Sequence, residues 1–168
     1  MSVSLSAKVC QEIDTWVAKF PKAQKRSAVI MALRLAQDAH GLVDEPVIQA
    51  VADYLGLPVV QVAEVATFYT MYRKQPTGTY RLAVCNSVSC MLCGSKQLLA
   101  YLKQTLKVEL DEVSQDGVFS IHETECLAAC AHAPALVIND IDYYYKMTPE
   151  KVDVLLAKLR EEVIDGTS

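Results

Sequence analysis

The amino-acid sequence predicts an α+β protein in which an N-terminal helical bundle precedes an α/β domain with a mixed sheet. Three observations support this prediction. The first 75 residues carry apolar side chains at helical spacing, and the residues after Gly78 alternate between strand-like and helical patterns. A polar segment with Pro and Gly separates the two parts (RKQPTG, 73–78). We therefore expect an N-terminal helical domain, 1–77, and a C-terminal domain, 78–168.

Four helices are expected in the N-terminal domain, because apolar residues recur there every three or four positions and known start and stop residues flank them. Ser6 can cap the first helix and Pro21 ends it. Gly41 follows the second helix, and Pro46 lies in the first turn of the third. The expected ranges are 6–20, 23–40, 44–56 and 58–72.

The C-terminal domain is expected to follow the order β, α, β, β, β, α. Its strands are short apolar runs, and its last helix begins with Pro149 after a Thr148 cap. The expected strands are 79–84, 118–122, 135–139 and 142–145, and the expected helices are 94–106 and 149–163. This order favours a small α/β domain with helices packed on a mixed sheet.

Composition excludes several classes of protein. Apolar residues make up 52% of the 168 residues, which suits a packed core, and the longest apolar run, 28–33, is far too short to span a bilayer. Acidic residues at Glu12 and Asp14 are unlike a transit peptide, and we expect a soluble protein without direct membrane insertion. Lys and Arg number 8 and Asp and Glu 13 from Gly78 onward, so no basic face for nucleic acid is expected.

The cysteines carry the first indication of function. There are six, of which Cys10 stands alone and five lie between positions 85 and 130. Six cysteines are too few for a disulfide-rich secreted scaffold of this length. With no secretion signal we expect a reducing compartment, where clustered cysteines bind metal or perform redox chemistry.

Two cysteine pairs follow expected strands: C-x4-C from Cys85 to Cys90 and C-x3-C from Cys126 to Cys130. Strand ends expose thiolates together with backbone N–H groups, which is what a [2Fe–2S] cluster needs. Two ferric ions, two sulfides and four thiolates carry a charge of −2, which becomes −3 after one-electron reduction. Because the acidic domain disfavours an added electron, we expect a low reduction potential.

Spacing alone leaves other interpretations open. Cys93 completes the C-x4-C-x2-C start of a plant-type ferredoxin, with Cys126 as a fourth ligand, but this leaves Cys130 unused. Cys90 and Cys93 also suit a thioredoxin-like dithiol, and four thiolates suit structural zinc. A Rieske site lacks its second C-x2-H motif. The sequence contains no Gly-rich phosphate-binding loop, so we expect that this chain does not bind NADH or FMN itself.

Four segments resemble the E subunit of NADH–quinone oxidoreductase, which is the small thioredoxin-like [2Fe–2S] subunit of respiratory complex I. The resemblance covers about residues 21–159, and its most specific part is the pair of cysteine motifs. The segments are VATFYTMY (65–72), CNSVSCMLCG (85–94), ECLAACAHAPALVIND (125–140) and MTPEKV (147–152).

The resemblance implies a thioredoxin-like C-terminal domain and one [2Fe–2S] cluster on Cys85, Cys90, Cys126 and Cys130. It also implies a heterodimeric partner subunit that holds FMN and NADH, within a larger membrane-attached complex. The expected location is cytoplasmic, in the peripheral arm on the inner face of the bacterial plasma membrane. NAD-reducing hydrogenases and NAD-dependent formate dehydrogenases use similar subunits and are the nearest alternative.

The sequence departs from the family pattern at Ala128, where Gly is usual in C-L-G-x-C. If this position needs a positive φ, Ala would cost on the order of 1 kcal/mol there. Cys93 is not a family ligand position.

The remaining candidates receive structural interpretations. We expect Cys10 to be a small buried hydrophobe, His40 to lie at a helix C-terminus and His122 to be structural. His132, just after the second motif, is expected in an exposed loop, with influence on the cluster as the alternative. Aromatic residues 68, 69 and 72 are expected in the helical core rather than in a partner-facing patch.

Overall fold

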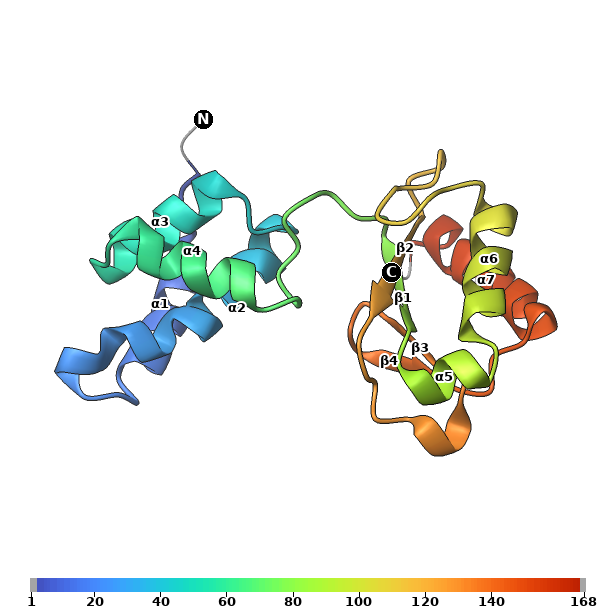
Figure 1. The fold of residues 1–168 in the computed structure, drawn as a ribbon. Helices are drawn as coiled ribbons and strands as arrows, with labels where there is room; N and C mark the ends of the chain where they lie inside the picture. Colours follow the sequence, from blue (N-terminus) through green and yellow to red (C-terminus); the bar gives the residue numbers. More distant parts are fainter. Residues whose placement is uncertain (1–2, 167–168) are drawn as a thin grey trace. The chain divides into compact units, whose positions relative to one another are not determined.

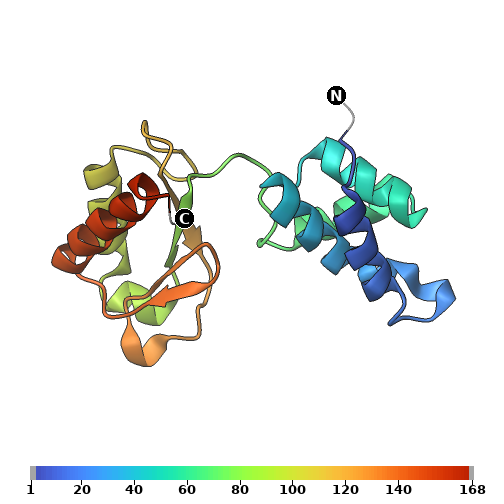
Figure 2. The same cartoon turned by 180° about the vertical axis from the view of Figure 1, so that it is seen from behind.

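The computed structural model describes residues 3–166, and its contacts divide the chain into two compact units, Met1–Pro76 and Thr77–Ser168. Figures 1 and 2 show that, among the described residues, the first unit has helices without strands and the second has the sheet. Helices and a four-stranded mixed sheet together confirm the predicted α+β class. Among the described residues, no helix is both long enough and apolar enough to cross a membrane.

The described part of the N-terminal unit, residues 3–76, contains four α-helices and one 3-10 helix around one apolar core. Its fully buried residues include Ile13, Leu33, Val51 and Val62, each from a different helix. Asp44 caps the start of the third α-helix as expected, since its side chain accepts a hydrogen bond from the Val47 N–H. The elements are α1 (Ala7–Val17), η1 (Lys22–Ala28), α2 (Val29–His40), α3 (Glu45–Leu55) and α4 (Val59–Phe68).

Three predicted helices are shorter than expected, and the first of them, α1, ends at Val17 rather than at residue 20. The range 23–40 is divided into η1 and α2, with Gln24 at a non-helical φ of −117°. Six of the seven residues of η1 are exposed, so no buried stripe holds this segment in α-helical geometry. Helix α4 ends at Phe68 rather than at residue 72, because Tyr69 is extended and the chain turns to bury Tyr72.

The C-terminal unit has a sheet with strand order β2-β1-β3-β4. β1 (Tyr80–Cys85) is parallel to β2 (Phe119–Thr124), whereas β3 (Leu136–Ile138) is antiparallel to β1 and to β4 (Asp142–Tyr144). Asn139 and Asp140, in the turn between β3 and β4, both have positive φ, which Asn and Asp tolerate.

Two long helices pack against this sheet. Helices α6 (Ser95–Leu106) and α7 (Pro149–Ile164) lie on the same side of the sheet in both views (Figures 1 and 2). Leu102 of α6 and Val152 of α7 share one core with Leu82, Phe119 and other strand residues. Alternate residues of β1 point into this core, as the pleat of a strand requires.

Two short elements were not predicted. Helix α5 (Val88–Leu92) follows the first cysteine of the C-x4-C motif, and the 3-10 helix η2 (Cys130–His132) begins at the last cysteine of C-x3-C. Neither is long enough to show a helical period in the sequence. Both lie in segments that connect a strand to the next element, and both place a cysteine.

Candidate metal centre

The two cysteine motifs follow neighbouring parallel strands. Cys85 is the last residue of β1 and is paired in register with Thr124, the last residue of β2. Because the strands are parallel, their carboxyl ends meet at one edge of the sheet, and the segments that leave them begin side by side. The topology therefore places the start of both motifs at the same edge.

Cys85 and Cys90 are buried, each with 2% of its surface exposed. The Cys85 backbone N–H donates to the Ala135 carbonyl at 3.1 Å, and its thiol donates to the Glu125 carbonyl at 3.1 Å. The first contact joins Cys85 to the chain just before β3, and the second joins it to the residue before Cys126. Cys85 is thus held from both sides.

Cys90 lies inside the short helix α5. Burial raises the pKa of its thiol, the backbone N–H of Ala135 lowers it, and the nearby Cys85 and Cys130 raise it again. These interactions place cysteines of both motifs near one another.

Cys126 and Cys130 are exposed and belong to the loop that follows β2. Within this loop Ala128 adopts φ +54°, and its N–H donates to Cys126 Sγ at 3.3 Å. The family position that usually holds Gly therefore does have positive φ in this chain.

The donor set fits an iron–sulfur cluster in its chemistry. Two backbone N–H groups, of Ala128 and Ala135, lie beside cysteine sulfurs, and such contacts spread the negative charge of a bound cluster. Within residues 3–166, no three Cys, His, Asp or Glu side chains converge on a point where one metal ion would bind. A two-iron cluster takes two thiolates on each iron, so its ligands come in pairs. The choice of Cys85, Cys90, Cys126 and Cys130 stays a prediction.

Cys93 is the residue just after α5 and is exposed, whereas Cys90 lies inside α5 and is buried. Its N–H donates to the Ser89 carbonyl at 3.1 Å, which completes the helix end. The two cysteines of the C-x2-C sequence therefore differ in environment.

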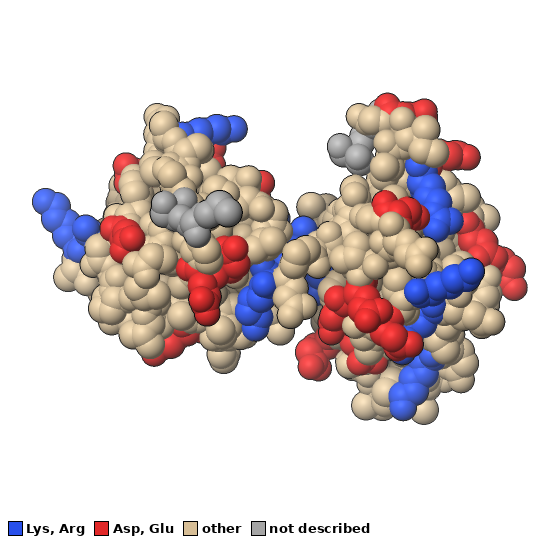
Figure 3. Space-filling model, turned by 90° about the horizontal axis from the view of Figure 1, so that it is seen from above, with Lys and Arg blue, Asp and Glu red and all other residues tan. Residues whose placement is uncertain are grey.

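The C-terminal unit as a whole is acidic. Asp and Glu outnumber Lys and Arg by 13 to 8 from Gly78 onward, and Figure 3 shows one group of acidic side chains beside a row of basic ones. Since negative side chains repel the electron that reduction adds to an anionic cluster, we expect this unit to lower the reduction potential of the cluster.

Sequence reasoning missed the surroundings of His122. Its Nδ1 lies 2.5 Å from the Asp111 carboxylate and its Nε2 lies 3.1 Å from Ser120 Oγ. Burial, and then the Arg81 charge, lower the pKa of this imidazole. Ser120 is fully buried, so the three groups form a structural network and not a nucleophile open to substrate. The alternation of Ser120 and His122 along β2 was visible in the sequence, whereas Asp111 was not.

The other candidates take mixed positions. Cys10 is half-buried, and its thiol faces the Leu5 carbonyl at 3.9 Å. His40 is the last residue of α2, as predicted. His132 lies against Tyr145, with 5.5 Å between the ring centroids.

The aromatic residues near the end of α4 differ in burial. Tyr72 is buried and donates to the Ile30 carbonyl at 2.7 Å, which confirms its place in the core. Phe68 is 78% exposed and Tyr69 is 38% exposed, so the core prediction is wrong for these two residues.

Several known proteins are similar to this chain over most of its length. The family model described as "Thioredoxin-like [2Fe-2S] ferredoxin" matches residues 13–160. One E subunit of NADH-quinone oxidoreductase from Rhizobium meliloti, numbered 2, is 41% identical over 150 residues, covering 89% of this chain and 88% of that protein. The E subunit of NADH-quinone oxidoreductase from Rickettsia bellii is 42% identical over 147 residues, covering 87% of each chain.

A third relative is NADH-quinone oxidoreductase subunit 2 of Thermus thermophilus, 38% identical over 148 residues, covering 88% of this chain and 82% of that protein. In fold, the chain is similar to an NAD+-reducing [NiFe]-hydrogenase in the air-oxidized state, with a TM-score of 0.67 and 20% identity. That match covers 78% of this chain and only 23% of the hydrogenase chain, and it concerns the fold alone.

Proposed function

Because this chain belongs to the thioredoxin-like [2Fe-2S] ferredoxin family, we propose that it carries one [2Fe–2S] cluster and transfers single electrons. The proposed ligands are Cys85, Cys90, Cys126 and Cys130. One observation carries the proposal: the parallel pairing of β1 with β2 starts both cysteine motifs at one edge of the sheet. When bound, the cluster takes up and returns one electron as one iron changes between ferric and ferrous.

The chain's own residues prepare the ligands for this role. Cys85 and Cys90 are shielded from water, which limits hydrolysis and exchange of the bonds they would form. Ala128 and Ala135 direct N–H groups at sulfur atoms of the second and first motifs respectively. Exposed Cys126 and Cys130 would leave one side of the cluster near the surface, where a redox partner can approach.

We further propose that the chain is a subunit of an NADH–quinone oxidoreductase. Three relatives bearing that name align over more than four-fifths of their lengths, which supports the assignment. A partner subunit would hold FMN and NADH, so that two-electron chemistry belongs to the partner and one-electron transfer to this chain. Its location would be the peripheral arm, on the inner face of the bacterial plasma membrane.

The nearest alternative is the equivalent subunit of an NAD-dependent hydrogenase or formate dehydrogenase. The fold similarity to an NAD+-reducing [NiFe]-hydrogenase is compatible with this alternative. The neighbouring reading frames distinguish the two: quinone-reductase subunits support the first proposal, and hydrogenase or formate dehydrogenase subunits support the second.

The cluster itself is tested on the full chain purified without oxygen. We expect about two iron and two sulfide per chain, a red-brown colour that dithionite bleaches, and a rhombic EPR signal after reduction. The competing function is a zinc-stabilised interaction module. Stoichiometric zinc with no iron, in a colourless protein, would establish that module and refute the cluster.

A further inference from the structure

The loop that carries Cys126 and Cys130 rests on the segment between β4 and α7. Beyond Cys130, the His132 carbonyl accepts from the Lys146 N–H at 2.8 Å, and the Pro134 carbonyl accepts from the Met147 N–H at 3.1 Å. The His132 ring also lies against the Tyr145 ring. The path of the chain leaving Cys130 therefore depends on where residues 145–147 lie.

Residues 145–147 belong to no helix or strand. Lys146 has a φ of +48°, a conformation that L side chains adopt at a cost. An irregular segment of this kind keeps a single conformation only when its surroundings hold it. Something outside the segment must therefore do so.

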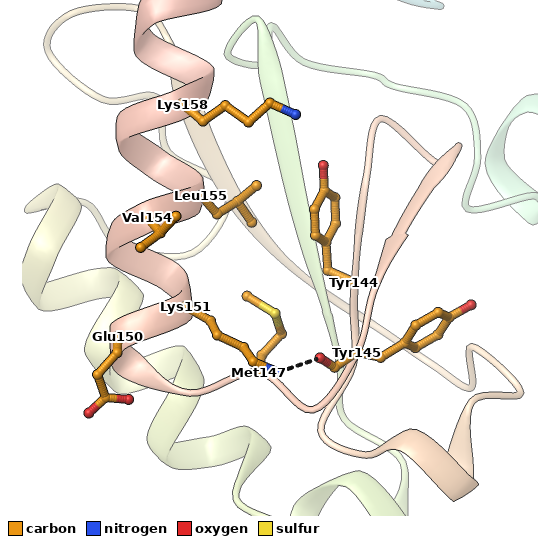
Figure 4. A pocket seen from close by; sticks show the side chains of 8 residues that line it. All are labelled: Tyr144, Tyr145, Met147, Glu150, Lys151, Val154, Leu155 and Lys158. Atoms are coloured by element: carbon orange, nitrogen blue, oxygen red, sulfur yellow. Dashed lines mark hydrogen bonds between the residues drawn. The ribbon is translucent and has the colours of Figure 1, made fainter.

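The side chain of Lys151 supplies this restraint. Its ammonium donates to the Lys146 carbonyl at 2.9 Å. It also donates to the Tyr145 carbonyl at 3.5 Å, the contact marked in Figure 4. Its backbone N–H meanwhile donates to the Thr148 hydroxyl that caps α7. One residue thus ties the start of α7 to the segment that supports the cysteine loop.

The position of this lysine goes against the preference of the helix itself. Lys151 is the third residue of α7, beside the positive end of the helix dipole, where an acidic side chain is favoured and a cation is disfavoured. The two carbonyls in front of its ammonium offset this unfavourable placement. A residue that breaks a local rule while making specific contacts indicates a role beyond helix formation.

We propose that Lys151 is a positioning residue for the second cysteine motif, holding residues 145–147 so that these in turn fix the loop beyond Cys130. The inference rests on the proposed function, since it concerns how the cluster ligands are held. Lys151 does not touch the cysteines. It acts through two layers of hydrogen bonds, from its ammonium to residues 145 and 146 and from residues 146 and 147 to residues 132 and 134.

Lys158 offers a matched control. It lies seven residues further along the same helix and lines the same groove of about 460 Å³ between β4 and α7 (Figure 4). Its ammonium pairs with Glu162 of the same helix at 3.5 Å. Lys158→Met therefore removes the same charge from the same groove and leaves the restraint on residues 145–147 in place.

The first measurement is amide hydrogen exchange in the full chain. We expect Lys151→Met to speed exchange at the Lys146 and Met147 amides on the order of tenfold, as the loss of one hydrogen bond to a charged group predicts. Lys151→Arg should restore protection, and Lys158→Met should match the wild type. If Lys151→Met does not fold, Lys151→Gln takes its place, because Gln is favoured at the third position of a helix.

The second measurement is the EPR spectrum of the reduced, cluster-loaded chain. We expect Lys151→Met to shift or broaden the signal and to lose iron to a chelator several times faster than Lys158→Met. Equal exchange at residues 146 and 147 in both variants would overturn the inference, as would an unchanged EPR signal in Lys151→Met. A wild-type chain without a [2Fe–2S] spectrum would instead refute the proposed function, while the exchange data would still test the restraint.

Discussion

The backbone N–H of Ala128 donates to Sγ of Cys126 at 3.3 Å, from a left-handed φ of +54°. Both features lie in the loop that joins Cys126 to Cys130, at the position where the family pattern usually has Gly. A residue with a Cβ thus occupies a place where Gly would adopt the same conformation without strain. The loop keeps this geometry at a cost in stability.

Replacing Ala128 by Gly should therefore stabilise the chain. The left-handed conformation costs Ala about 1–2 kcal/mol, and Gly would remove this strain. Gly also has more conformational freedom in the unfolded chain, which favours unfolding and offsets part of the stabilisation. We expect Ala128→Gly to raise the free energy of unfolding by roughly 0.5–1 kcal/mol, measured by urea denaturation of the metal-free chain.

The neighbouring position is the control for this substitution. Ala129 has a φ of −108°, which costs Ala nothing, so Ala129→Gly should lower the free energy of unfolding. A loss of stability in both variants would show that φ at residue 128 is not what Ala128→Gly changes.

Serine substitutions separate the ligand sets. We expect Cys126→Ser to abolish or severely reduce cluster content, because it removes a proposed ligand, and Cys93→Ser to keep it, because that exposed thiol is outside the set. Iron and sulfide analysis with visible absorption measures both. If the chain were instead a dithiol oxidoreductase built on Cys90 and Cys93, Cys93→Ser would abolish its thiol–disulfide exchange activity and Cys126→Ser would not.

Stability of the C-terminal unit should fall on mild acidification because of His122. Its folded pKa is lowered from the ordinary 6.5, chiefly by burial, so the unfolded chain binds the proton more readily. The stabilisation is complete above about pH 6.5 and is lost as the pH falls toward the lowered folded pKa. His122→Gln, which keeps a hydrogen-bonding side chain, should flatten this dependence.

The measurement is urea unfolding followed by circular dichroism between about pH 7.5 and 5.5, which lies above the ordinary pKa range of carboxylates. Trp16, the single tryptophan, lies in the N-terminal unit, and its fluorescence serves as an internal reference. An unchanged pH dependence in His122→Gln would assign the effect to another group.

Gly78 lies where the chain enters β1 and passes close to β2. A Cβ there would lie 2.4 Å from the backbone carbon of Phe119, a contact that the strand can relieve only by moving. We expect Gly78→Ala to destabilise the C-terminal unit by about 1–3 kcal/mol, as overpacking of a closed interior does.

Gly117→Ala provides the comparison, since a Cβ there meets nothing within 4 Å and only its φ of +73° is unfavourable. Its expected cost is about 1 kcal/mol. Equal or greater destabilisation by Gly117→Ala would mean that the close approach of residue 78 to β2 is not the dominant effect.

Much of the architecture could be predicted because local rules agree with the fold. Pro21, Gly41 and Pro46 end or begin helices at or within a few residues of where their backbone preferences place them. The strands were found within one or two residues, since short apolar runs between turns are a local pattern. The division at residues 77 and 78 into two folding domains stays a prediction, which limited proteolysis would test.

Residues whose conformation depends on distant partners were not predictable in this way. Tyr72 shortens α4 because its hydroxyl reaches the carbonyl of Ile30, which lies 42 positions earlier. Asp111 meets His122 only because the chain before β2 folds back along it. The partners of these contacts lie 42 and 11 positions apart, so neither contact follows the three- or four-residue spacing of a helix or the alternation of a strand.

The cysteine site likewise combines features that local sequence predicts with features that depend on distant contacts. The sequence predicted thiolate ligands with two spacings that suit a two-iron cluster, and its motifs indicated the family. The folded chain adds three facts: both motifs start at one sheet edge, Ala128 is left-handed, and Lys151 reaches residues 145 and 146. Spacing along a chain is a local property, whereas strand pairing and hydrogen bonds between loops join residues that the sequence keeps apart.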